Sequence, residues 1–267
     1  MTNALRTLDV VLIIDEYDRT SSQQLNQRLA DTIKALSDEN SPCKFLVVGV
    51  APSVDVLIGE HRSIERSLCQ ILLQRMSREE LHEIVNKGES VLKVEFDPGV
   101  KNRIVGLSDG LPYFTQLIAY YAVTAWARDG RGAVIGLLEL RAGLGEAVSN
   151  ATETLRSGYA QAIKTVKSTS QRFRNVLWAC AMPEEVEVQA QQIAQHVSTI
   201  EQKKVRLLAF SYHLSELTKG TRGQILTRVS KGWYKFSNPL MRGYVRLQME
   251  YDNLLYHDGQ MLFPFMK

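Results

Sequence analysis

Two adjacent carboxylates follow an apolar run near the start of the sequence. Residues 10 to 18 read VVLIIDEYD, so Asp15 and Glu16 come directly after Val, Leu and Ile residues that are typical of a buried strand. An aspartate in this position can orient water on a Mg²⁺ ion, and the glutamate after it can polarise the water that attacks a terminal phosphate. The simpler alternative is that both carboxylates leave the sheet and cap the following helix.

A serine follows the next apolar run. KFLVVGV at 44 to 50 reads as a second strand, and Ser53 comes three residues later. In open α/β sheets, ligands lie beyond the carboxyl ends of the strands, so Ser53 is expected to face the same crevice as Asp15. A loop serine that bonds its own backbone explains Ser53 equally well.

An amphipathic helix is predicted between the two strands. Leu25, Leu29, Ile33 and Leu36 recur at helical spacing between the strand at 10 to 14 and the strand at 44 to 50. Two continuous apolar strands joined by a helix predict a βαβ unit, with both strands buried on both faces of a parallel sheet.

Helical patterns dominate after residue 75. Ser77 and Glu80 have the spacing of a capping box, while Asp97-Pro98 and Pro112 can each start a helix. The helical pattern continues from about 133 to 168. This middle part is therefore predicted to be all-helical.

The last third combines helices with a hairpin. Three helices are predicted, over 172 to 182, 188 to 197 and 203 to 217, and two β-segments follow between 225 and 237 around a Gly-containing turn. PLMRGYVRLQM then reads as a final helix. Three helices and a β-hairpin predict a winged helix-turn-helix.

Composition fits a globular protein in a reducing compartment. The chain has 267 residues, of which 45% are hydrophobic and 23% charged. Its three cysteines show no paired spacing, which argues against a disulfide framework or a zinc knuckle. The N-terminus lacks a secretory signal pattern, and the apolar stretch at 110 to 127 is interrupted by polar residues, which favours a buried helix over a membrane span. A cytoplasmic location is expected.

Positive charge gathers near the C-terminus. Between residues 201 and 247, ten Lys or Arg residues stand against Glu201 and Glu216, a net charge of +8. Because the whole chain carries +3, the remainder carries −5. This asymmetry indicates a separate basic module, and double-stranded DNA is the partner that it suggests.

In their order along the chain, these motifs resemble those of the AAA+ and STAND P-loop ATPases, in particular the origin-recognition-like branch with a C-terminal winged helix. LIIDEYD resembles a Walker B segment, FLVVGVAPS a sensor 1 strand, and HRSIERSL the end of the core; SREEL would open the lid, DGLPYFTQL resembles its GxP-type motif, and WYKFSNPLMRGYV the wing and final helix. The resemblance implies a partial α/β P-loop NTPase core with a parallel sheet, in a chain that is mostly α overall. The expected domains are the core at 1–75, a helical lid and connecting helix at 76–168, the winged-helix domain at 169–250 and a tail at 251–267.

The resemblance also implies residue roles. Asp15 would hold Mg²⁺, Glu16 would act as the general base, Ser53 would sense the γ-phosphate, Pro112 would touch the adenine side of ATP, and Arg66 would be an arginine finger. Arg62 is a second candidate for the finger, and a surface ion pair with Glu60 or Glu65 is the alternative for either arginine. Aromatic residues follow the Gly-Leu-Pro where AAA+ proteins often carry a sensor 2 arginine, which favours the STAND-like pattern and weakens the case for robust hydrolysis.

The phosphate-binding half of such a site is not recognisable in the sequence. A P-loop reads GxxxxGK[ST], yet the sequence contains no Gly-Lys pair, and only nine residues precede Val10. A truncated fragment, a start assigned too late and a genuine loss of the P-loop are the three explanations. On each of them we expect this chain alone to bind ATP poorly, and its first sheet to expose an unpaired edge.

The basic module is the other candidate for function. The predicted helix at 203 to 217 would enter the major groove of DNA, while the predicted wing would lie along phosphates. The expected DNA contacts are Lys203, Lys204, Arg206, Arg228, Lys231 and Lys235. Because Leu207, Leu208, Phe210, Leu214 and Leu217 are expected to face the domain's own core, an internal latch is the alternative. His196 and His213 have no metal-like partners in the sequence.

The resemblance therefore implies the C-terminal portion of an ATP-dependent switch that is coupled to a winged helix, which binds DNA or a partner protein. ATP and Mg²⁺ would be the cofactors of the intact protein. A homo-oligomer is also compatible with an arginine finger. The competing hypothesis is a non-enzymatic DNA-binding or adaptor protein that keeps only the fold of an ATPase. No membrane partner is expected.

Overall fold

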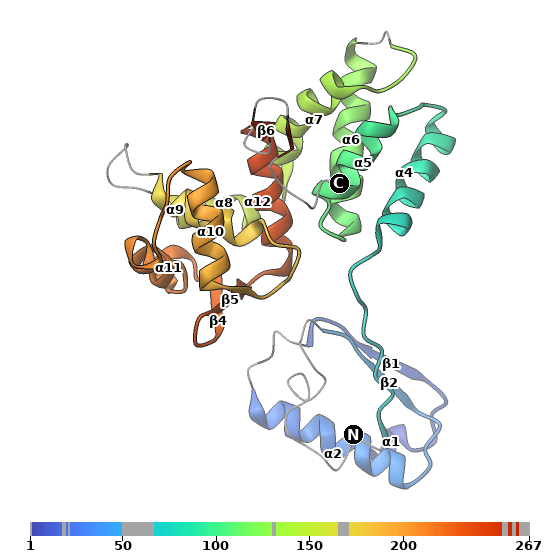
Figure 1. The fold of residues 1–267 in the computed structure, drawn as a ribbon. Coiled ribbons are helices and arrows are strands. Elements are labelled where there is room, and N and C mark those ends of the chain that lie inside the picture. The colour runs from blue at the N-terminus through green and yellow to red at the C-terminus, as the bar shows by residue number, and fades with distance from the viewer. Residues whose placement is uncertain are drawn as a thin grey trace. The chain divides into compact units, whose positions relative to one another are not determined.

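The chain forms two compact units. The computed structural model describes residues 2–17, 20, 22–49, 67–129, 132–164, 171–252, 256–257 and 260–261. Residues Met1–Gln74 form the first unit and Arg75–Lys267 the second, and the described residues are mostly helical (Figure 1). Each unit is described on its own.

The first unit contains a parallel strand pair and a helix. Its elements are α1 (Thr2–Leu5), β1 (Val11–Ile14), α2 (Gln23–Asp38) and β2 (Lys44–Val47). β1 and β2 pair in parallel, with Ile14 opposite Val47. Ser22 caps α2 by accepting a hydrogen bond from the Leu25 amide at 3.3 Å. The strand–helix–strand order predicted from the sequence is confirmed.

The burial predicted for these strands is wrong. Val11 is 62% exposed, Ile13 65% and Leu46 44%, so alternate side chains of both strands face solvent. α2 buries Ala30 and Ile33 on its apolar face, which provides cover for one face of the strand pair. An all-apolar strand is buried on both faces only where a second layer covers the other face, and the described residues of the first unit supply no such layer.

The second unit begins with helices. They are α4 (Arg78–Leu92), α5 (Pro98–Leu107), α6 (Pro112–Asp129), α7 (Leu137–Asn150), α8 (Glu153–Ile163) and α9 (Arg172–Ala181). The predicted helix starts are confirmed: Ser77 and Glu80 form a capping box, Asp97 caps α5, and Pro112 is the first residue of α6. None of the described helices combines the length and apolar character that a bilayer span requires.

A small antiparallel sheet follows. The remaining elements are β3 (Val188–Gln189), α10 (Ala190–Ile200), the 3₁₀ helix η3 (Leu207–Ala209), α11 (Ser211–Leu217), the 3₁₀ helix η4 (Gly220–Arg222), β4 (Leu226–Ser230), β5 (Trp233–Phe236), α12 (Pro239–Tyr251), β6 (Tyr256–His257) and β7 (Gln260–Met261). β3, β5 and β4 lie in that order in one antiparallel sheet. Gly232, with φ of 84°, makes the turn of the predicted hairpin.

Two predicted helices have different bounds in the structure. Val188 and Gln189 pair with β5 as a strand, and α10 begins only at Ala190. The helix predicted from Lys203 is wrong at its start, because regular α-helix begins at Ser211. An extended segment takes the place of the first helical turns. The Oγ of Ser198 accepts a hydrogen bond from the amide of Val205 at 3.0 Å, which keeps this segment extended.

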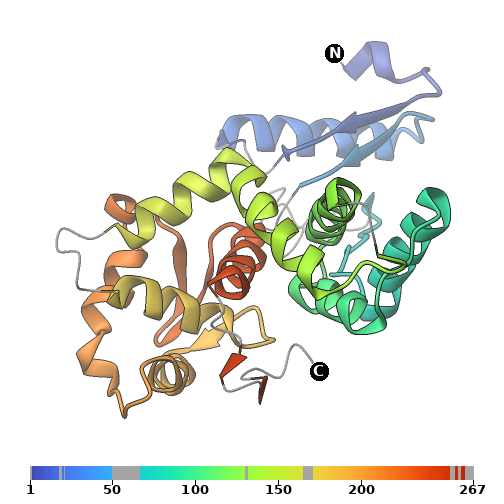
Figure 2. The same cartoon turned by 90° about the horizontal axis from the view of Figure 1, so that it is seen from above.

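One apolar core runs through the second unit. α12 lies between α7 on one side and α8 and α9 on the other (Figures 1 and 2), and it buries Tyr244, Val245 and Leu247. Side chains from both the 76–168 segment and the 169–250 segment belong to this core. The division between those two segments therefore stays a prediction.

Candidate functional sites

The carboxylate pair lies in a tight turn at the end of β1. The Oδ1 of Asp15 accepts a hydrogen bond from the Glu16 amide at 2.7 Å, and Glu16 adopts left-handed backbone geometry with φ of 54°. Both side chains are exposed. A non-glycine residue held in this conformation is uncommon and concentrates at functional sites.

Backbone pairing with the neighbouring strand fixes this turn. The amide of Val48 donates to the carbonyl of Ile14 at 2.8 Å, and the amide of Tyr17 donates to the carbonyl of Val48 at 3.0 Å. Tyr17 is buried, which raises the pKa of its phenol, and its hydroxyl donates to the Oδ1 of Asn26 on α2 at 2.9 Å. The two carboxylates are therefore presented from a fixed point at the carboxyl edge of the strand pair.

This arrangement fits Mg²⁺ better than a metal that is bound by protein ligands alone. Among the residues that the structure describes, no three His, Cys, Asp or Glu side chains gather as a metal cluster. Mg²⁺ usually keeps several waters and takes one or two carboxylates together with substrate phosphates. Asp15 and Glu16 meet that requirement only when a phosphate-bearing ligand completes the site.

The structure does not place the other predicted nucleotide residues relative to this pair. Ser53, Arg62 and Arg66 lie outside the described residues. Pro112 belongs to the second unit, where it begins α6 directly after the left-handed Gly110 and Leu111. Of the five residues to which the sequence gave nucleotide roles, the structure thus brings together Asp15 and Glu16.

A buried aspartate in the second unit binds three arginines. Asp109, which is 8% exposed, accepts at Oδ2 from Arg75 at 2.6 Å and from the Nε of Arg242 at 2.8 Å. Its Oδ1 accepts from the Nη2 of Arg242 at 2.7 Å and from the Nη1 of Arg246 at 2.8 Å. We call these four residues the Asp109 cluster.

Backbone carbonyls satisfy the remaining guanidinium donors. Arg246 donates to the carbonyls of Ala181 and Pro183, each at 2.7 Å, and Arg242 donates to that of Glu184 at 3.0 Å. Burial lowers the pKa of Arg246 to about 10, while the charge of Asp109 opposes that shift. The cluster therefore joins four segments of the second unit: its first residue, the α5–α6 turn, the loop after α9 and helix α12.

The sequence did not reveal this cluster. Arg242 and Arg246 counted toward the basic C-terminal module, but they are 4% and 3% exposed and cannot reach a nucleic acid. The two arginines are four residues apart, so both lie on one face of α12 among apolar residues. This placement was the signal for their burial that the sequence offered. The distant partner Asp109 could not be identified from the sequence, because 133 positions separate it from Arg242.

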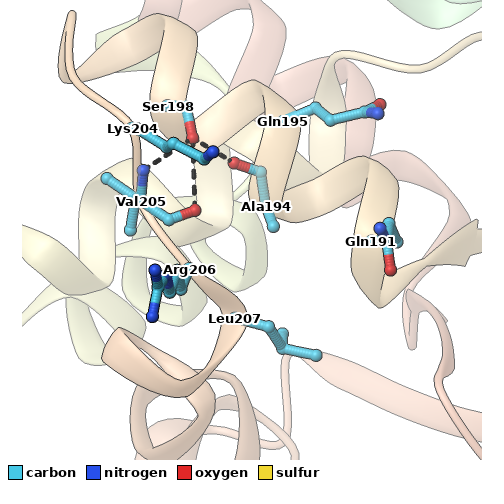
Figure 3. A pocket seen from close by; sticks show the side chains of 8 residues that line it. All are labelled: Gln191, Ala194, Gln195, Ser198, Lys204, Val205, Arg206 and Leu207. Atoms are coloured by element: carbon cyan, nitrogen blue, oxygen red, sulfur yellow. Dashed lines mark hydrogen bonds between the residues drawn. The ribbon is translucent and has the colours of Figure 1, made fainter.

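An open groove lies between α10 and the start of the basic module. It has a volume of about 510 Å³, and Figure 3 shows its lining by Gln191, Ala194, Gln195 and Ser198 of α10 and by Lys204, Val205, Arg206 and Leu207 of the following segment. The hydroxyl of Ser198 already forms hydrogen bonds with the backbone of Ala194 and Val205. The groove thus offers two cations and two exposed amide side chains to a ligand.

The six predicted DNA contacts fall into two groups. Lys203 pairs with Glu201 at 3.5 Å, and Lys235 pairs with Glu187 at 3.6 Å. The four others are exposed and form no ion pair with a carboxylate in the described part of the chain: Lys204, Arg206, Arg228 and Lys231. Lys204 and Arg206 line the groove, whereas Arg228 and Lys231 lie on the β4–β5 hairpin.

The surface of α11 differs from the prediction. Phe210, Leu214 and Leu217 are buried as expected, but Leu208 is 87% exposed, so its predicted place in the core is wrong. Leu207, also predicted to face the core, is 38% exposed. The 3₁₀ helix η3 replaces the expected helical turn here, and neither leucine is buried with Leu214.

Two histidines of the second unit predict a loss of stability in acid. Burial is the main cause that lowers the pKa of both His196 and His213 below the ordinary 6.5, and Arg172 and Arg222 lower that of His213 further. Well above pH 6.5 both are neutral in the folded and the unfolded chain. As the pH falls, the unfolded chain binds their protons first, so the free energy of unfolding decreases.

Urea titrations between pH 8 and pH 5 measure this loss. The double variant His196→Gln and His213→Gln is expected to show a shallower decrease below pH 6.5 than the unaltered chain. His82→Gln, on α4, provides the single-histidine control. An unchanged slope in the double variant would assign the acid sensitivity to other groups.

Comparison with known proteins gives structural similarities only. No protein-family model matches the chain, and no curated sequence is significantly similar to it. Its structure is similar to the Thermotoga maritima RuvB Holliday junction branch migration motor, with 15% identity, a TM-score of 0.43, and 96% of this chain and 73% of that chain covered. It is also similar to Cdc6p from Pyrobaculum aerophilum, with 11% identity, a TM-score of 0.45, and coverage of 96% and 70%.

A third similar structure is that of the Aeropyrum pernix Orc1 protein in complex with DNA, with 14% identity, a TM-score of 0.39, and coverage of 92% and 65%. All three TM-scores are below 0.5, so the likeness by itself decides neither the function nor the role of any residue.

Proposed function

We propose that the chain is part of an AAA+/STAND-type ATP-binding switch whose basic module is a winged helix that binds double-stranded DNA. The observation that carries the DNA-binding half is a set of four exposed cations on one module, which form no ion pair with a carboxylate among the described residues. The observation that supports the nucleotide half is the constrained Asp15–Glu16 turn at the carboxyl edge of parallel strands.

In the nucleotide half, Asp15 holds Mg²⁺ and Glu16 orients and polarises water. Mg²⁺ supplies charge neutralisation to the phosphates when the nucleotide is bound. The exposure of both carboxylates and the fixed backbone around them support these roles. Ser53, Arg66 and Pro112 retain the roles that the resemblance implies for them, as parts of this proposal.

Titration with a fluorescent ATP analogue tests this half. Binding by this chain is expected to be weak, so the titration extends to high concentrations of the analogue. Its Mg²⁺-dependent part should disappear in Asp15→Asn, because the ion loses its carboxylate. Asp31→Asn, an exposed position on α2, is the matched control and should bind like the unaltered chain. Equal Mg²⁺ dependence in all three proteins would remove Asp15 from its role.

The order of the elements between residues 172 and 236 supports the winged-helix assignment. Helix α9, strand β3, helices α10 and α11 and strands β4 and β5 follow in that order, and β5 lies between β3 and β4 in the sheet. In such a domain the last of the three helices enters the major groove and the β4–β5 hairpin is the wing. Arg228 and Lys231 of the hairpin would then contact phosphates.

Fluorescence anisotropy with a duplex at two salt concentrations tests DNA binding. Because binding rests on phosphate contacts, we expect clear affinity near 50 mM salt and a strong loss near 200 mM. No affinity at the lower concentration would contradict the proposal and leave the module without a nucleic-acid role.

A specific observation favours a second candidate, an adaptor that binds a partner protein. Leu208 is 87% exposed and Tyr212 65% exposed on neighbouring turns of η3 and α11, and α11 itself contains no Lys or Arg. Apolar side chains of this kind are typical of protein interfaces. The duplex titration separates the two candidates, since an adaptor without a nucleic-acid role should show no affinity at the lower salt concentration.

A further inference from the structure

The turn between α5 and α6 is locked onto α12 at several points. Asp109 and Gly110 both have left-handed backbone conformations, with φ of 55° and 72°. Arg242 binds both carboxylate oxygens of Asp109. One turn into α6, Phe114 is fully buried and packs directly on α12. We call this contact region, Asp109 to Phe114 with Arg242 to Arg246, the α6–α12 joint.

Two glycines show how closely the joint is packed. A Cβ at Gly243 would lie 2.6 Å from the Phe114 ring, and a Cβ at Gly110 would lie 2.6 Å from the Cβ of Arg75. The amide of Met76 also donates to the carbonyl of Gly110 at 2.9 Å. Packed interfaces of this density do not deform continuously, so a displacement of the turn moves α12 or breaks the joint.

α12 is in turn connected to the basic surface, by which we mean the groove and hairpin that carry Lys204, Arg206, Arg228 and Lys231. Asn238 caps α12 and directly follows Ser237, whose amide donates to the carbonyl of Ile225 at 3.0 Å. The hydroxyls of Ser237 and Thr227 are 2.7 Å apart, which ties the start of α12 to β4. On the other side, Arg242 holds the carbonyls of Glu184 and Glu185, just before β3.

We infer that Asp109 is a positioning residue that couples the turn at the start of α6 to the basic surface through α12. The inference rests on the proposed function, because the turn carries Pro112 on the proposed adenine side and the basic surface is the proposed DNA site. A ligand that shifts the turn changes the pose of the β4–β5 hairpin. By linkage, DNA bound at the basic surface changes the stability of the turn to the same extent.

Hydrogen exchange of the full chain, with and without a saturating DNA duplex, tests this coupling without any nucleotide. In the unaltered protein, DNA should protect residues 204–231 directly, and it should also slow exchange at residues 110–115 by at least about fivefold. In Asp109→Asn the distant effect should disappear while the direct protection remains. Arg242→Lys keeps the charge but loses the forked contact, and it provides the same comparison should Asp109→Asn fail to fold.

Glu250→Gln is the matched control. Glu250 is another buried carboxylate that ties α12 to α5, through Arg103, but it does not touch the turn. This variant should retain the distant effect. Protection of 204–231 without any response at 110–115, or equal loss in Glu250→Gln and Arg242→Lys, would overturn the inference. Absence of protection at 204–231 would overturn the proposed DNA binding and the inference with it.

Discussion

Replacing Asp109 by Asn is expected to lower the free energy of unfolding of the second unit by about 3–5 kcal/mol. The substitution removes the carboxylate that Arg75, Arg242 and Arg246 share, and it leaves two of these guanidinium groups buried without a counter-charge. Urea unfolding followed by circular dichroism at pH 7 measures the loss.

Glu83→Gln provides the control for this experiment. Glu83 lies on the exposed face of α4, and its replacement should change stability by less than about 0.5 kcal/mol. A loss in Asp109→Asn as small as that of the control would mean that the arginines are satisfied by backbone carbonyls alone. The charge of Asp109 would then contribute little, and the contacts of the arginines with backbone carbonyls would hold α12 in place.

Neutralising the four exposed cations of the proposed DNA site is the second change with a large expected effect. The variant carries Gln at Lys204, Arg206, Arg228 and Lys231. Each phosphate contact contributes about 0.9 to the slope of log affinity against log salt, so the slope should fall by about 3.6 and affinity near 50 mM salt by at least roughly tenfold. Anisotropy titrations with a DNA duplex across salt concentrations measure both quantities.

The control variant has the same change in net charge. Arg28, Lys34, Lys87 and Lys93 are exposed and lie on or next to α2 and α4, outside the basic module, and Gln at these positions should leave the slope unchanged. Equal effects of the two quadruple variants would show that overall charge, and not this surface, attracts the duplex. The winged-helix proposal would then lose its main support.

The sequence predicted local features well where a short-range signal existed. Capping at Ser77, helix starts at Asp97 and Pro112, and the turn at Gly232 depend on neighbouring residues, and the structure has each of them. The parallel pairing of β1 and β2 also followed from the apolar pattern.

Long-range contacts set the features that could not be predicted. Val188 belongs to a strand only because β5 passes beside it, and Val205 is extended because Ser198 binds its backbone. The burial of Arg242 depends on Asp109, and no local pattern identifies Asp109 as its partner. Asp15 and Glu16 were correctly placed at the end of a strand, but their chemical roles stay predictions.

Arg75 stands at the boundary of the two units, and this position has a practical consequence. Ile71, Leu72 and Leu73 are 75%, 72% and 87% exposed, so they form an accessible site for a protease that cleaves after apolar residues. A cut there leaves Arg75 attached to the helical fragment, with its bonds to Asp109 and to the carbonyl of Pro239 intact. A recombinant fragment that starts at Met76 would instead lack one of the three cations around Asp109. We expect it to unfold at a lower temperature than a fragment that starts at Arg75.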